Sequence, residues 1–85
     1  MVDRVLPAAE LQPQAEKFAQ RLAAGPARAF AAAKRLTAAY TEGGVEAADE
    51  RLGEDAVGLF DTEDARNAID SFLAAGPGNA TFAGR

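Results

Sequence analysis

The chain has 85 residues, a formal net charge of −4 and neither cysteine nor histidine. The missing side chains exclude disulfides, thiolate nucleophiles, Ser-His-Asp triads and metal sites built on Cys or His, and the acidic balance argues against nucleic acid as a partner. Alanine supplies about a quarter of the chain, whereas Leu, Ile, Val and Phe together supply about a fifth, so the composition predicts a helical segment that needs a partner to complete its core.

The first seven residues are predicted to form a short extended lead, over residues 1–7. Val2 and Val5 favour extended backbone, and Pro7 biases Leu6 away from the helical region. The sequence offers no second strand to pair with this lead. Its backbone N–H and C=O groups would therefore need a strand from elsewhere, and a frayed terminus is the alternative.

The first predicted helix spans about residues 11–24. Leu11, Phe18 and Leu22 recur at helical spacing and form one apolar stripe. Pro13 is tolerated only in the first turn, where its missing N–H breaks no hydrogen bond. We therefore expect this helix to begin near Leu11.

Glycine and proline separate the helices that follow. Gly25-Pro26 ends the first helix, and Gly43-Gly44 ends a second, alanine-rich helix over about residues 27–40. A third helix over about residues 45–59 is amphipathic.

Gly53 and Gly58 lie inside this third helix. Each costs about 1 kcal/mol relative to alanine in a helix interior. The two glycines indicate either a weak helix or close packing against another element.

A side-chain oxygen of Asp61 or Thr62 is expected to cap a last helix, which ends near Ala75. Phe72 and Ile69 belong to its apolar stripe. The fold class predicted from these elements is all-α, with three to four amphipathic helices after the extended lead. The layout is a lead over residues 1–7, a helical domain over residues 8–76 and an irregular tail over residues 77–85.

Four glutamates recur at every fourth position. One interpretation is a row of carboxylates for metal or acid–base chemistry, but a di-metal bundle also needs facing carboxylates and usually histidine. The favoured interpretation is a solvated acidic face, partly balanced by Arg51 near Asp55. The four are Glu42, Glu46, Glu50 and Glu54.

Lys34 and Arg35, with Arg28 two helical turns earlier, form a basic cluster. Such a cluster could hold the phosphate groups of a nucleotide-like ligand, and a solvated helix face is the alternative.

Phe60, Phe72 and Phe82 are the aromatic residues near the C-terminal end. They could present an aromatic surface to a ring-bearing ligand, or they could anchor a core or an interface.

Several motifs occur in a characteristic order. The most specific is the run from Phe60 through Asp61-Thr62-Glu63-Asp64-Ala65-Arg66 before a helix that ends in Phe72-Leu73. The others are Val2–Pro7, Glu10-Leu11, Ala23–Pro26, Ala32–Leu36 and the ending Phe82–Arg85. Together they resemble the C-terminal segment of an enoyl-CoA hydratase/isomerase of the crotonase superfamily.

The resemblance implies different roles for the N-terminal and C-terminal parts of the whole protein. In the family, an N-terminal core carries the acyl-CoA site and the catalytic residues, and C-terminal helices provide oligomer contacts and cover the CoA site. It therefore implies no catalytic residue, no metal and no cofactor on this chain, with a coenzyme A thioester as the substrate of the whole protein. The reaction would be hydration of a 2-enoyl-CoA, a lyase activity of fatty-acid metabolism, or a related enolate-stabilised isomerisation. The candidate CoA-binding residues are Lys34, Arg35, Phe60 and Phe82.

The partners expected from this interpretation are an N-terminal core and other copies of the chain in a homo-oligomer, with neither nucleic acid nor membrane. The sequence has no apolar run long enough for a membrane span and no signal-peptide pattern, so we expect a cytoplasmic location. The alternative function is a stand-alone helical protein-interaction module. An independent enzyme is not expected, because the chain has no His, no Cys and no convergent pair of carboxylates.

Overall fold

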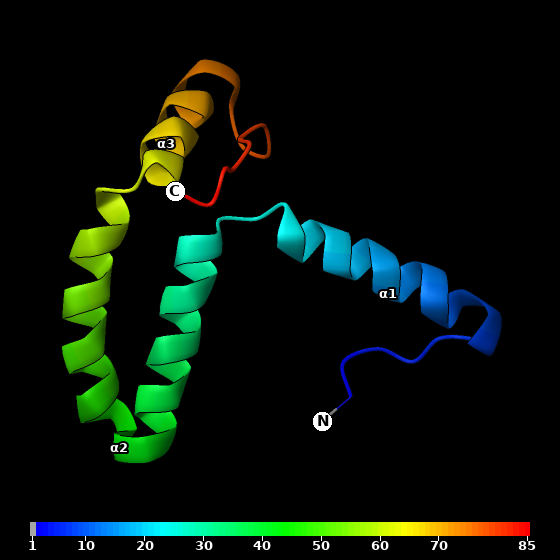
Figure 1. Cartoon of the computed structure of the whole chain (residues 1–85), viewed down its shortest axis with the longest axis horizontal. Helices are drawn as coiled ribbons and strands as arrows, with labels where there is room; N and C mark the ends of the chain where they lie inside the picture. The colour runs from blue at the N-terminus through cyan, green and yellow to red at the C-terminus, as the bar shows by residue number, and fades with distance from the viewer. Residues whose placement is uncertain (1) are drawn as a thin grey trace.

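The computed structural model describes residues 2–85 and is all-helical in class, as predicted. It contains three helices: α1 (Ala8–Ala23), α2 (Ala27–Phe60) and α3 (Glu63–Ala75) (Figure 1). Within residues 2–85 there is no β-strand. Residues 2–7 form neither helix nor strand and bend at Asp3, and Val2 and Val5 are exposed. Met1, the first residue of the predicted lead, lies outside the described residues.

Helix α1 begins at Ala8, three residues before the predicted start. The residue before it, Pro7, has φ −55° and ψ 145°, and its carbonyl accepts from Glu10 N at 2.9 Å. Pro13 therefore lies inside the helix, beyond the first turn, which corrects the expected start near Leu11. Pro13 has no N–H to donate to the carbonyl of Ala9, so α1 lacks one backbone hydrogen bond there.

Helix α2 is a hairpin of two arms, over residues 27–43 and 45–60, that bend at Gly44. Gly44 has φ 73° and ψ −160°, a conformation that glycine adopts without a Cβ penalty. A Cβ on Gly43 would lie 2.7 Å from the Cβ of Ala47, so the turn also needs a small residue there. The predicted break at Gly43-Gly44 is confirmed, although the helix continues past Tyr40 up to the turn. Figure 1 shows the two arms lying side by side.

Helix α3 begins with the expected cap, and Thr62 supplies it. Thr62 Oγ1 accepts a hydrogen bond from Ala65 N at 3.1 Å and donates one to Leu59 O at 2.7 Å. The hydroxyl therefore links the end of α2 to the start of α3. Gly76, at φ 77°, ends the helix, and the tail then folds back toward the start of α3 (Figure 1).

The three helices do not enclose a hydrophobic core. Within residues 2–85, Ala32 is the one buried apolar residue, at 5% exposed. Helix α1 has no buried residue and extends away from the hairpin (Figure 1). The radius of gyration is 16.1 Å, whereas a compact domain of this length has about 12 Å. In the described part of the chain, no helix is long and apolar enough to cross a membrane.

Candidate interaction surfaces

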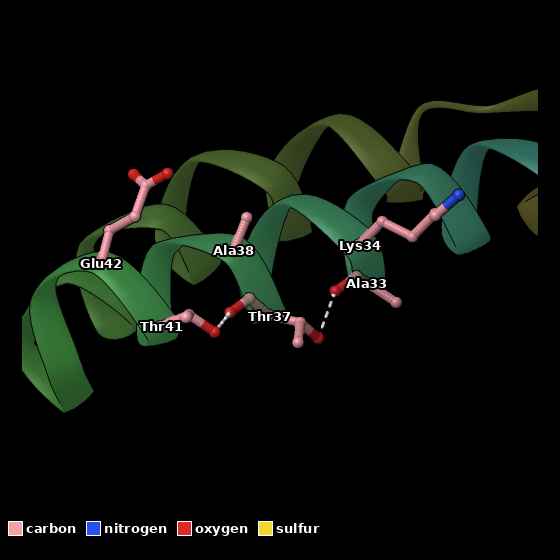
Figure 2. A pocket seen from close by; sticks show the side chains of 6 residues that line it. All are labelled: Ala33, Lys34, Thr37, Ala38, Thr41 and Glu42. Carbon is pink, nitrogen blue, oxygen red and sulfur yellow. Dashed lines mark hydrogen bonds between the residues drawn. The ribbon is translucent and has the colours of Figure 1, made fainter. Parts of the chain in front are cut away.

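Lys34 lies on an open face of the first arm of α2 (Figure 2). This face has a shallow hollow of about 540 Å³, and every residue that lines the hollow comes from the first arm. Thr37 Oγ1 donates to Ala33 O at 2.9 Å, and Thr41 Oγ1 donates to Thr37 O at 2.9 Å. Both hydroxyls therefore bond to the backbone of their own helix. Lys34 and Glu42 are exposed, and their backbone positions are about 12 Å apart along the helix axis. This face offers a ligand one cation without enclosing it.

Arg35 is held by Asp55 on the opposite arm of the hairpin. Arg35 Nη2 lies 2.8 Å from Asp55 Oδ1, and Arg35 Nε lies 3.3 Å from both carboxylate oxygens. Arg51 Nε lies 3.4 Å from Asp55 Oδ2, an ion-pair distance without hydrogen-bond geometry. The Asp55 side chain is 13% exposed. The pair therefore joins the two arms at a partly desolvated position.

The same contact shifts the pKa of both partners. The hydrogen bonds from Arg35 hold the pKa of Asp55 below its ordinary value; partial burial opposes this, and the charges of Arg35 and Arg51 reinforce it. The hydrogen bond to Asp55 likewise raises the pKa of Arg35. Arg35 thus bonds to the opposite arm of the hairpin, whereas its sequence neighbour Lys34 lies on a separate face.

The two aromatic candidates differ in exposure. Phe60, the last residue of α2, is 69% exposed. Phe82 is half-buried in a hollow of about 200 Å³ that Leu59 and Ala68 also line. Lys34, Arg35 and Phe82 line three different hollows. The structure therefore does not gather the candidate CoA residues around one site.

Asp64 holds the tail against α3, and we call this arrangement the tail clamp. The Asp64 side chain accepts from Ala83 N at 2.7 Å through Oδ1 and from Gly84 N at 2.8 Å through Oδ2. Its own N–H donates to the main-chain oxygen of Arg85 at 2.8 Å. Asp64 is only 3% exposed, so its carboxylate is buried with two N–H donors. Bonds of this charge-assisted type are among the stronger hydrogen bonds in proteins.

The sequence interpretation missed the tail clamp. It treated Asp61–Arg66 as a helix cap and Phe82–Arg85 as a tail, without linking them. Two features of the sequence could have indicated the tail clamp. One is Asp64, an additional carboxylate two positions after the capping Thr62, and the other is Gly84 in the tail. Gly84 has φ 80°, which suits a backbone that turns its N–H toward the carboxylate.

The four regularly spaced glutamates are all exposed. Glu54 lies 3.4 Å from Arg51 Nη1, and the Arg51–Asp55 pair expected from the sequence also forms. Among residues 2–85, no group of three or more acidic side chains is placed to hold a metal ion. The acidic row is a solvated face, as the favoured interpretation predicted.

The most extensive candidate surface is apolar. Large apolar side chains are exposed on all three helices, whereas Ala32 is the one buried apolar residue among residues 2–85. They are Leu11, Phe18 and Leu22 on α1, Phe30, Tyr40, Val45, Leu52, Val57 and Phe60 on α2, and Ile69, Phe72 and Leu73 on α3.

Comparison with protein-family models, with curated proteins and with solved structures finds no match for this chain. The resemblance to the crotonase superfamily therefore rests on the motifs of the sequence alone.

Proposed function

We propose that this chain is the helical part of an enoyl-CoA hydratase/isomerase-like protein, where it makes oligomer contacts and covers the acyl-CoA site. The observation that carries the proposal is the contrast, over residues 2–85, between many exposed apolar side chains and a single buried apolar residue, Ala32. Surfaces of this kind are typical of elements that pack against another subunit or domain.

The tail clamp supports the same proposal. The two motifs it joins, Asp61–Arg66 and Phe82–Arg85, are the most specific run and the ending on which the resemblance depends. The clamp gives both motifs one physical role, because it fixes the end of the chain beside the first turn of α3. The partner core would supply the catalytic residues and the thioester-binding groups, and the reaction is hydration of a 2-enoyl-CoA or a related enolate-stabilised isomerisation.

Lys34 is the candidate for a CoA phosphate on this chain. Among residues 2–85 its ammonium forms no ion pair, whereas Arg35 is engaged by Asp55. Phe60, 69% exposed, is accessible to an adenine ring, and Phe82 is half-buried in a hollow that Leu59 also lines.

The test is a graft of residues 2–85 onto the core of an enoyl-CoA hydratase whose own C-terminal helices have been removed. We expect the hybrid to recover the oligomeric state in light scattering and the hydration of crotonyl-CoA, because α2 and α3 would cover the exposed core. In that hybrid, Lys34→Ala should raise KM several-fold with kcat unchanged. A hybrid that stays monomeric and inactive, while the core's own helices restore it, would contradict the proposal.

The second candidate is a stand-alone helical interaction module, and the exposed stripe of α1 favours it specifically. Such a module needs a partner helix or strand but no acyl-CoA core. An inactive hybrid together with a chain that still binds an apolar helix would support this function.

A further inference from the structure

The apolar stripe of α1 has a basic border. Leu11, Phe18 and Leu22 are exposed along one side of the helix. The Arg21 guanidinium lies 5.8 Å from the centroid of the Phe18 ring, so positive charge adjoins the stripe directly. The border extends to Lys17, one turn before Arg21.

Arg4, Lys17 and Arg21 line one open hollow beside α1, and we call these three residues the basic patch. Within residues 2–85 none of the three forms an ion pair. Three neighbouring cations repel one another and favour an acidic partner.

The outward face of the second arm of α2 has the complementary character, and we call it the acidic face. Glu46 and Glu50 lie one turn apart, both exposed and without an ion pair in the described residues. Val57 and Phe60, 70% and 69% exposed, continue this face toward the end of the arm. The face thus carries two carboxylates beside apolar side chains.

Gly53 lies between these carboxylates and Val57. A Cβ at this position would meet nothing within 4 Å, so the fold of one chain does not need glycine there. Glycine inside a helix costs about 1 kcal/mol relative to alanine. Glycine there leaves the surface between the two carboxylates and Val57 without a side chain.

The exposed area is sufficient for a contact with a second chain. The chain exposes 6808 Å², whereas a compact monomer of this size exposes about 4,800 Å². The excess of about 2,000 Å² exceeds the roughly 800 Å² that each partner buries in a typical stable interface.

We propose that α1 of a second copy of this chain docks on the acidic face, with its stripe on Val57 and its basic patch on Glu46 and Glu50. Lys17 and Arg21 are spaced by four residues, as Glu46 and Glu50 are, so both pairs span about 6 Å and can meet charge to charge. This inference deepens the oligomer contact proposed above and rests on it.

The experiment is sedimentation velocity on the whole chain and on two charge-reversal variants, Lys17→Glu/Arg21→Glu and Glu46→Lys/Glu50→Lys. Each variant alone should self-associate at least tenfold more weakly than the wild type. An equimolar mixture should restore a complex of wild-type affinity within about threefold, because the reversed charges again complement each other. The matched control is Arg28→Glu/Lys34→Glu, which reverses two exposed cations on the first arm and should associate like the wild type.

A further variant, Gly53→Leu, separates folding from docking. Leucine favours helix more than glycine, so helicity by circular dichroism should be maintained or rise while self-association falls at least tenfold. If the wild type associates and the variants associate equally well, or if the mixture fails to restore the complex, the docking inference is wrong and the oligomer role stands. If the wild type stays monomeric at several hundred micromolar, both are wrong.

Discussion

At the scale of single residues, Asp64 is the most consequential side chain. Its buried carboxylate satisfies two tail N–H groups and has no competing salt bridge in the described residues. The neighbouring Glu63–Arg85 contact, at 3.6 Å, is exposed and adds little. The Asp64 carboxylate therefore accepts two of the three hydrogen bonds that join the tail to the first turn of α3.

Replacing Asp64 with alanine should release the tail. Each charge-assisted hydrogen bond contributes about 1.5–3 kcal/mol, so the amide protons of Ala83 and Gly84 should exchange with solvent roughly 10- to 100-fold faster in the variant. Nuclear magnetic resonance measures this exchange directly. Asp61→Ala is the matched control, because the Asp61 side chain is exposed and outside the clamp. Unchanged protection in Asp64→Ala would show that another contact holds the tail.

At the scale of elements, the hairpin of α2 depends on the turn at Gly44 and on the pair that links its arms. Arg35 and Asp55 are 20 positions apart and meet because the turn folds one arm back on the other. The Asp55 pKa is lowered by this contact, so the charged carboxylate is favoured in the folded chain.

The pair should make the hairpin acid-sensitive. A lowered folded pKa contributes stability that is fully present above the ordinary aspartate value of 3.8 and is lost as the pH falls below it. We therefore expect the gap in urea midpoint between the wild type and Asp55→Asn to be widest near pH 6 and to narrow between pH 4 and pH 2. Circular dichroism at one fixed protein concentration follows it, with Asp49→Asn as the exposed control. A gap that stays constant over this range would rule out the role assigned to the pair.

The sequence predicted the elements that depend on local chemistry. Gly44 and Gly76 need positive φ, and Thr62 caps the residue three positions later, so each boundary follows from neighbours in the chain. The start of α1 is predicted too late, because the rule that confines proline to the first turn puts the start near Pro13, whereas the helix begins directly after Pro7.

The contacts at the candidate sites were harder to predict. Asp64 meets Ala83 and Gly84 across 19 and 20 positions, and Arg35 meets Asp55 across 20. Spacing rules for a single helix predict contacts only between residues three or four positions apart. Contacts over 19 or 20 positions depend on how separate segments pack against each other. For this reason the sequence places Arg35 in a basic cluster, either a phosphate site or a solvated face, and does not predict its bond to Asp55.

At the scale of the whole molecule, the open shape follows from the alanine-rich composition. Alanine methyl groups favour helix but bury little area, so the helices form while the apolar stripes remain outside. We propose that this chain completes its core only by association.

Thermal unfolding measured at a series of protein concentrations tests this claim most directly. Because association stabilises by mass action, the account predicts a broad transition at low micromolar concentration and a Tm that rises, with a sharper transition, as the concentration increases. A sharp, cooperative transition of a monomer, with a Tm independent of concentration, would contradict it.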